Sequence, residues 1–331
     1  MKKPALLLAA ALSAAFATGG FTAEPTSGST TTLDTVLVTG VQPGPGLWKV
    51  SHGAHVLWIL GVLEPLPSQL DWRNDEVERK IAQSQEVIGL SIGKLGFVTL
   101  FALPSMRSLA SFKELPDGQH LRDVLSPELY ARWSAVKARY APHDDDLERL
   151  RPPYALNALY DKALEQAGLE RNLDIWKSVR RLARRHHVRV VTNDFDQFVR
   201  HPNDAFRQLA NAPADNGLSC FESRLPLLEN DLRDLRLRAN AWSTGDIQAL
   251  LQSGPIEERF DCGETMRVAS ALDGPLTTMK TRLVDDWLRE ADAALAKNES
   301  TVAVQLMSRL LAPDGVLAAL RARGYTVEAP E

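Results

Sequence analysis

The sequence predicts an α/β or α+β fold with a small central mixed sheet, an N-terminal β-hairpin and a large helical insertion. Short β-prone runs lie near both ends of the chain, and helical repeats of apolar residues fill its middle, about residues 105–300. No internal repeat is present. With 331 residues, of which 44% are hydrophobic, the chain is long enough to bury a full core.

The first 23 residues have the pattern of a secretory signal peptide. Lys2 and Lys3 precede a short apolar stretch at residues 6–17, and Phe21-Thr22-Ala23 offers a small-residue cleavage site. The stretch is too short to span a bilayer. We therefore expect a periplasmic or secreted protein without a transmembrane segment in its mature form.

Residues 24–44 are rich in Ser, Thr, Gly and Pro, which is typical of a flexible leader or linker. Within them, residues 33–40 form a short β-prone run that resembles a TonB box. A tethering strand or linker explains the run more simply. The resemblance nevertheless keeps open the alternative that the chain is a partner of the TonB system. The folded domain is expected over residues 45–331.

The charge of the chain is mildly acidic. The formal net charge is −4, and cleavage after residue 23 would remove two lysines and no acid, leaving about −6. This balance argues against a dedicated binder of nucleic acid or of anionic membranes.

Two cysteines, Cys220 and Cys262, suit a disulfide in an oxidising compartment. Two separate buried thiols are the alternative. A disulfide would close a loop with 41 intervening residues. In the chain-entropy model such a loop stabilises the fold by about 3–4 kcal/mol.

The hairpin is predicted at residues 47–61, with a turn at His52-Gly53-Ala54-His55. The two histidines have the spacing of a metal pair, but at a hairpin tip we expect them to point into solvent. Beyond it, residues 88–103 read as a strand followed by a buried turn and helix. Apolar periodicity then predicts helices at 74–85, 126–140, 156–167, 173–185, 203–211, 218–242, 245–251, 279–295 and 315–322, and strands at 86–91, 187–192, 301–304 and 325–328.

Two charged runs have a structural and a functional interpretation. His143-Asp144-Asp145-Asp146 could hold a cation, but an acidic cap before a helix is favoured. The basic run from Arg180 to Arg189 could bind a polyanion, but a solvated helix end is favoured because no aromatic residues are interleaved.

Four blocks of sequence occur in an order that is typical of one family. They are Gly46-Leu47-Trp48-Lys49-Val50, Leu57-Trp58-Ile59-Leu60-Gly61, Ala241-Trp242-Ser243-Thr244-Gly245-Asp246-Ile247 and the run from Pro313 to Val327. Together they resemble the TraB/GumN family, which also contains the TIKI metalloproteases. The resemblance implies a TIKI/TraB-like fold and a metal-hydrolase site whose histidines lie in two G-x-x-H motifs.

The positions that match these motifs read Gly61-Val62-Leu63-Glu64 and Leu306-Met307-Ser308-Arg309. Glu64 stands in place of the first histidine, and Arg309 stands near the second. The glutamates that the resemblance implies would fall near Leu90 or Ser91 and near Thr192. The candidate site residues are therefore Gly61, Glu64, Ser308 and Arg309, with Glu64 as the one candidate for catalysis.

These replacements favour a non-catalytic protein that binds or assembles with an unidentified protein or envelope component. No cofactor and no nucleic acid are expected. The alternative is a peptidase-like hydrolase with an altered site, which would require Mn, Co or Zn. We further hypothesise that Glu64 and Arg309 form an ion pair where relatives hold a metal.

Overall fold

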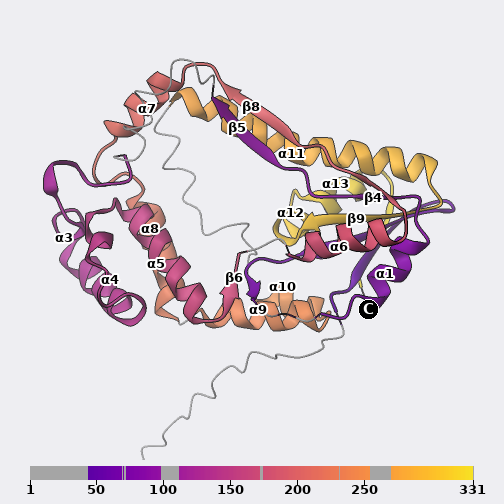
Figure 1. Ribbon diagram of the computed structural model, residues 1–331, viewed down its shortest axis with the longest axis horizontal. Helices are drawn as coiled ribbons and strands as arrows, with labels where there is room; N and C mark the ends of the chain where they lie inside the picture. The colour runs from indigo at the N-terminus through magenta and orange to yellow at the C-terminus, as the bar shows by residue number, and fades with distance from the viewer. Residues whose placement is uncertain are drawn as a thin grey trace, which may run out of the picture. The chain divides into compact units, whose positions relative to one another are not determined.

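The computed structural model describes residues 44–68, 70, 72–97, 112–171, 174–230, 232–253 and 270–330 (Figure 1). All of them belong to one unit, residues 35–331, which is described here by itself. The predicted signal peptide, the leader up to residue 43, the β-prone run 33–40, Cys262 and residues 98–103 of the predicted turn and helix lie outside the described residues.

A six-stranded mixed sheet forms the centre of the fold, in the strand order β10-β1-β2-β9-β4-β7. Strands β2, β9, β4 and β7 run parallel, whereas β1 is antiparallel to both of its neighbours, β2 and β10. The mixed α/β prediction is confirmed. The strands are β1 (Leu47–His52), β2 (His55–Val62), β4 (Glu86–Ile88), β7 (Arg189–Val191), β9 (Ser300–Leu306) and β10 (Thr326–Glu328).

The predicted N-terminal hairpin is present as β1 and β2. His52 pairs with His55 at its tip, and Gly53 adopts a φ of +60° in the turn, where glycine has no Cβ to clash. Val50, Leu57 and Ile59 are fully buried. The hairpin therefore carries β2 into the core as a central strand.

Helices cover both faces of this sheet. Helix α1 packs against α6, and α11 packs against α13. The chain moves from β2 to β4 to β7 and then returns through β9 toward β10, and for right-handed crossovers this reversal puts the two helix pairs on opposite faces. The helices of the sheet region are α1 (Asp75–Ala82), α6 (Asp174–Arg185), α9 (Arg233–Ser243), α10 (Ile247–Gln252), α11 (Ser270–Lys297), α12 (Met307–Leu311) and α13 (Val316–Ala322).

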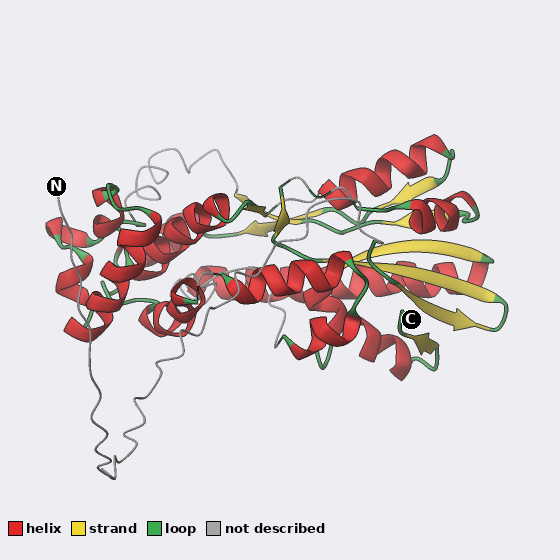
Figure 2. Cartoon of the chain, turned by 90° about the horizontal axis from the view of Figure 1, so that it is seen from below, coloured by secondary structure: helices red, strands yellow, loops and turns green. Residues whose placement is uncertain are grey.

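A second, mainly helical region has its own apolar core, in which Trp133, Leu156, Leu159 and Phe221 are fully buried. Figures 1 and 2 show the helices of this region at one end of the view and the six-stranded sheet at the other. Its elements are α3 (Leu121–Val124), α4 (Pro127–Tyr140), α5 (Pro152–Gln166) and α8 (Leu218–Glu229), with short 3-10 helices at Pro116–Gly118 and Asp145–Arg149. The helix α7 (Pro202–Ala210) packs in a third, smaller apolar cluster with Val199 and with Leu272 of α11.

Several predicted helices follow their sequence signals closely. Ser126 caps α4, since its side chain accepts a hydrogen bond from the Leu129 N–H at 3.2 Å, and a proline follows at the first helical position. Asp246 caps α10 in the same way through the Ala249 N–H at 2.9 Å. No helix in the described part of the chain is long and apolar enough to cross a membrane.

The single helix predicted at residues 218–242 is wrong. The structure has two helices, α8 and α9, separated at residues 230–232. Pro226 lies inside α8 and lacks the N–H that helix continuation requires, and α8 ends within one turn of it. Leu232 then adopts a left-handed φ of +55°, which redirects the chain into α9.

The prediction at residues 88–103 is wrong in part. The strand is present and ends at Ile88 as β4, but residues 93–97 are strand and not the predicted turn and helix. After β4, residues Gly93–Phe97 form the strand β5, which pairs in parallel with an unpredicted strand β8 (Phe195–Val199). A smaller antiparallel pair joins β3 (Leu66–Pro67) to β6 (Leu169–Glu170). Residues 93–97 of the apolar run are therefore strand, and their partner strand lies about 100 residues further along the chain.

Candidate functional site

The two motif segments end adjacent parallel strands. In the register of β2 and β9, Gly61 pairs with Gln305 and Val62 pairs with Leu306, so both strands stop at the same level. Glu64 follows β2 by two residues and Arg309 lies in α12 directly after β9. The carboxyl ends of parallel strands are where open α/β sheets place their ligand sites. The fold thus brings the two motif positions, about 245 residues apart in sequence, to one edge.

Gly61 is required by close packing at this edge. A Cβ at this position would meet the Met307 Cε atom at 2.6 Å and the Trp48 ring at 3.0 Å. Its carbonyl accepts a hydrogen bond from the indole N–H of Trp242 at 2.8 Å, in a buried setting. Two of the sequence blocks, the one ending in Gly61 and the one containing Trp242, therefore meet directly.

The second motif segment is held in a similar way. The indole N–H of Trp287, on α11, donates to the Val304 carbonyl at 3.0 Å. Gly315, in the last sequence block, lies so close that a Cβ there would meet the Arg309 carbonyl oxygen at 2.3 Å. Tryptophan donors and close glycine contacts thus fix the backbone of both motifs.

The side chains of the motif positions are partly enclosed. Glu64 and Arg309 are both half-buried, and each takes part in a polar or electrostatic contact. The Ser308 hydroxyl is buried and has no hydrogen-bond partner among the described residues. The predicted direct ion pair between Glu64 and Arg309 stays a hypothesis.

The ends of β4 and β7 complete the edge without supplying acids at the two expected positions. Leu90 is buried, Ser91 is half-buried and Thr192 is exposed. The loops after the two strands are tied together by the side chain of Asp194, which accepts a hydrogen bond from the Ile92 N–H at 2.9 Å. The Asp194 carboxylate therefore acts as a hydrogen-bond acceptor for the backbone of the neighbouring loop.

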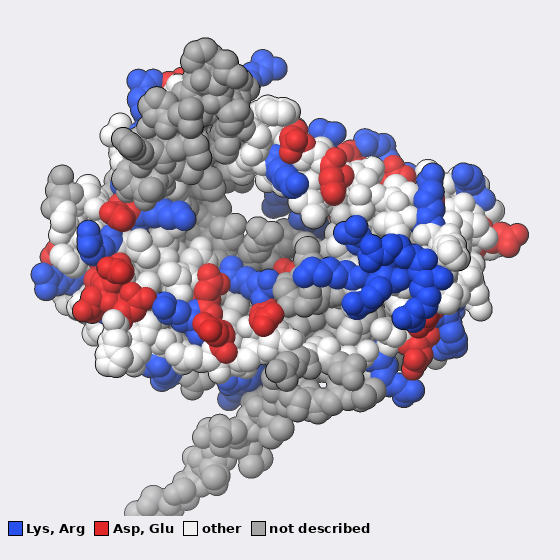
Figure 3. Space-filling model, in the orientation of Figure 1, with Lys and Arg blue, Asp and Glu red and all other residues white. Residues whose placement is uncertain are grey.

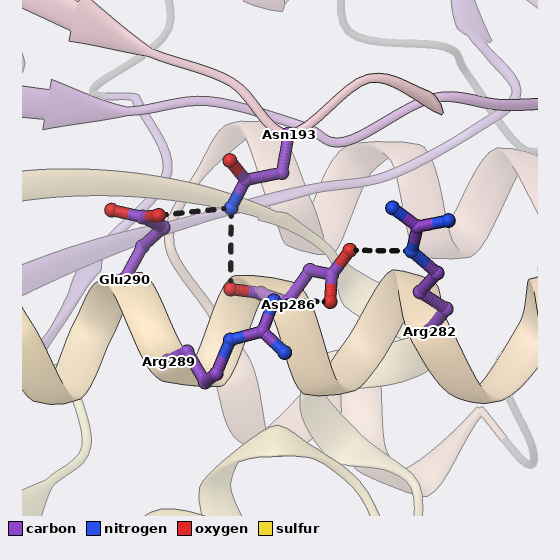
Figure 4. A network of polar contacts seen from close by, with 5 residues as sticks. All are labelled: Asn193, Arg282, Asp286, Arg289 and Glu290. Atoms are coloured by element: carbon purple, nitrogen blue, oxygen red, sulfur yellow. Dashed lines mark hydrogen bonds and ion pairs between the residues drawn. The ribbon is translucent and has the colours of Figure 1, made fainter. Parts of the chain in front are cut away.

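Sequence reasoning missed a polar network between this edge and α11 (Figure 4). The Asn193 side-chain amide donates to the Asp286 carbonyl at 3.3 Å and to the Glu290 carboxylate at 3.2 Å. The Asp286 carboxylate, with only 6% of its side chain exposed, accepts from Arg282 and Arg289. The i, i+4 and i, i+3 spacing of these charges on a helix was the available signal.

The polar side chains at this edge, including Glu64, Arg309 and Asp286, do not fit a catalytic metal site. A metal site needs about three protein ligands and an open position, and a guanidinium has no lone pair to offer. Asp286 is held by two arginines instead. In the described part of the chain, no three His, Cys, Asp or Glu side chains come together in a way that could hold a metal ion.

The expectation that both histidines of the hairpin tip point into solvent holds for His52, which is exposed, and is wrong for His55, which is half-buried. His55 makes a hydrogen bond to the Asn298 carbonyl at 2.6 Å through Nδ1, and the His52 ring packs edge-on against Tyr325 at 5.4 Å between ring centres. Both contacts join the hairpin tip to segments near the C-terminus. A hairpin tip in mid-sheet has neighbours that sequence spacing does not reveal.

The predicted acidic cap is wrong in its detail. Asp144 precedes a short 3-10 helix but makes no side-chain capping hydrogen bond. Instead, Asp144 pairs with Lys162 at 3.0 Å and Asp145 pairs with Lys137 at 3.2 Å. The run therefore joins α4 and α5 through ion pairs.

The remaining candidates lie away from the edge. Cys220 is half-buried on α8, and its predicted partner lies outside the described residues, so the disulfide stays a prediction. Two cavities lined by described residues are also elsewhere. One lies along α7 and includes Asp204 and Asn211, and the other lies beside β6 and includes Asp161 and Arg171.

The fold and the edge define a mixed α/β domain whose key glycines and tryptophans hold two strand ends together. The chain belongs to the TraB/PrgY/gumN family, which it matches over residues 46–329. No curated protein and no solved structure matches the sequence significantly.

Proposed function

We propose that this chain is an exported, periplasmic or secreted protein that uses the family scaffold for binding or assembly, with a degenerate metal-hydrolase site. The observation that supports the proposal is the register of β2 and β9, which sets the Glu64 and Arg309 segments at one edge. The scaffold contacts of both motifs support the proposal, as do Glu64 and Arg309 at the positions where the resemblance implies histidines.

The charges of the two replacements favour this proposal. A permanent guanidinium beside a cation is electrostatically unfavourable, and Arg309 cannot act as a ligand. A carboxylate and a guanidinium would neutralise each other without a metal if Glu64 and Arg309 approach within ion-pair distance. No cofactor is therefore part of the proposal, and the partner is an unidentified protein or envelope component.

The alternative is a metal-dependent, peptidase-like hydrolase with an altered site. The half-buried Glu64 at the carboxyl edge, with the buried Ser308 hydroxyl on the neighbouring segment, is the observation that keeps it in view. In this alternative Glu64 would act as a ligand or as a general acid or base, and Mn, Co or Zn would be required.

A hydrolysis assay separates the two proposals. The mature protein would be incubated with a mixed peptide library, with and without Mn²⁺, Co²⁺ or Zn²⁺, and the products followed by mass spectrometry. We expect no cleavage that depends on Glu64. Metal-stimulated cleavage that disappears in Glu64→Ala but persists in the exposed control Glu76→Ala would reject the non-catalytic proposal.

A further inference from the structure

The exposed face of α6 carries one kind of charge. Among the described side chains of this helix, every exposed one is cationic. Figure 3 shows blue side chains gathered over the position of α6. We call this set the cationic face: Lys177, Arg180, Arg181, Arg184 and Arg185.

The opposite face of α6 anchors the helix in the main core. The apolar residues of this 12-residue helix repeat on one stripe, and all of them are buried. The cations follow the i, i+3, i+4 pattern on the other side and span about 12 Å along the axis. The buried side of α6 therefore holds the cationic face in a fixed position on the domain. The buried residues are Ile175, Trp176, Val179, Leu182 and Ala183.

Few acids neutralise this face. Glu78 binds Arg185 at 2.9 Å and His186 at 2.8 Å. By contrast, no ion pair joins Arg180, Arg181 or Arg184 to an acid in the part of the chain that the structure describes. Arg181 donates to the neutral Ser178 hydroxyl at 2.8 Å. Most of the positive charge is therefore available to a ligand.

We propose that the cationic face of α6 docks onto anionic phospholipid headgroups at a membrane surface. Guanidinium groups match phosphate oxygens through paired N–H donors. The row lies on the outside of a helix, which suits a broad surface. Trp176, the aromatic residue within the row's helix, is buried, so the base stacking that single-stranded nucleic acids require is not offered.

The acidic net charge of the chain does not oppose this docking. Screening at physiological salt limits charge interactions to about 8 Å, so a bilayer surface senses the local face and not the distant acids. The net charge of −4 describes the whole chain. The sequence argument against an anionic-membrane binder therefore applies to the average and not to α6.

Vesicle co-sedimentation of the full mature chain tests the proposal. Vesicles of phosphatidylcholine alone are compared with vesicles that contain about one third phosphatidylglycerol. The test variant is Arg180→Gln/Arg181→Gln/Arg184→Gln. The matched control, Arg122→Gln/Arg233→Gln/Arg321→Gln, makes the same charge change at three other exposed arginines. Circular dichroism confirms that both variants are folded.

We expect the wild type to bind only the anionic vesicles and to be released by high salt. The test variant should lose about 100-fold in partition coefficient, since each cation near an anionic surface contributes roughly a factor of five. The control should change by less than about 3-fold. Inorganic phosphate at matched ionic strength should not displace the protein.

Three results would overturn the proposal. One is equal binding to neutral and anionic vesicles, and another is an equal loss of binding in both variants. The third is binding to heparin or RNA without binding to phosphatidylglycerol vesicles, which would assign the face to a different polyanion.

Discussion

At the scale of single residues, the scaffold of the candidate edge depends on glycine and tryptophan more than on charge. Because Gly61 has no side chain, Met307 and Trp48 pack directly against its backbone. The indole N–H of Trp242 donates a hydrogen bond to the Gly61 carbonyl. The sequence resemblance identified Gly61 and Trp242 as motif residues. It could not show that they touch, because 180 residues of chain separate them.

Gly61→Ala tests this close packing. The new Cβ would overlap the Met307 side chain and crowd Trp48, so we expect a loss of about 1–3 kcal/mol in the free energy of unfolding. Urea unfolding followed by tryptophan fluorescence measures it. The control is Gly274→Ala in α11, where a Cβ meets nothing within 4 Å, and it should be neutral or slightly stabilising. Equal effects in both variants would refute the packing argument.

At the scale of elements, apolar periodicity predicted most helices and the hairpin. It could not predict where a helix is interrupted or which distant strands pair. The α8–α9 break depends on Pro226 and on a left-handed Leu232 in an otherwise apolar, helical pattern. Strand β8 was missed because it is short and half-exposed and pairs with β5 across a long separation. Local sequence favours an element, and tertiary partners decide its limits.

The contact between α4 and the end of α8 gives a pH prediction. Arg132 donates two hydrogen bonds, of 2.7 and 2.9 Å, to the Glu229 carboxylate. These bonds hold the pKa of Glu229 below its ordinary value of 4.5. Because the folded pKa is lowered, the stabilisation is present above the unfolded pKa and is lost as pH falls through the folded pKa.

Glu229→Gln should therefore cost about 0.5–1 kcal/mol of unfolding free energy near pH 7, a modest value because the pair is partly exposed to solvent. Near pH 3 the difference from the wild type should shrink as the wild-type carboxylate takes up a proton. Urea titrations at both pH values check this. Glu165→Gln, an exposed acid on α5, is the control and should change little at either pH. A Glu229 effect that is independent of pH would contradict the assignment.

At the scale of the whole molecule, the fold class and the family were predictable from four ordered blocks. The strand order was not, because β9 comes from near the C-terminus and inserts between β2 and β4. That insertion is what sets Glu64 and Arg309 at one edge. The spacing of Arg282, Asp286 and Arg289 on one helix was readable in the sequence. The link from Asn193 to this helix was not, since it needs the loop after β7 to meet α11.

The predicted Cys220–Cys262 disulfide belongs to this scale because it would cross-link two distant segments. If it forms after export, intact mass with and without reduction should differ by two hydrogens. Loss of the cross-link in Cys220→Ser/Cys262→Ser should lower stability by about 3 kcal/mol. Two freely alkylated thiols in the oxidised, native protein would exclude the disulfide.

We propose that this chain keeps the family scaffold and carries the opposite charges of Glu64 and Arg309 in place of a metal site. Metal analysis of the purified mature protein by mass spectrometry, after exposure to Mn²⁺, Co²⁺ and Zn²⁺ and extensive dialysis, tests it most directly. We expect far less than one metal ion per chain, with no change in Glu64→Ala. One bound Mn, Co or Zn per chain that disappears in Glu64→Ala would show that a metal site is present.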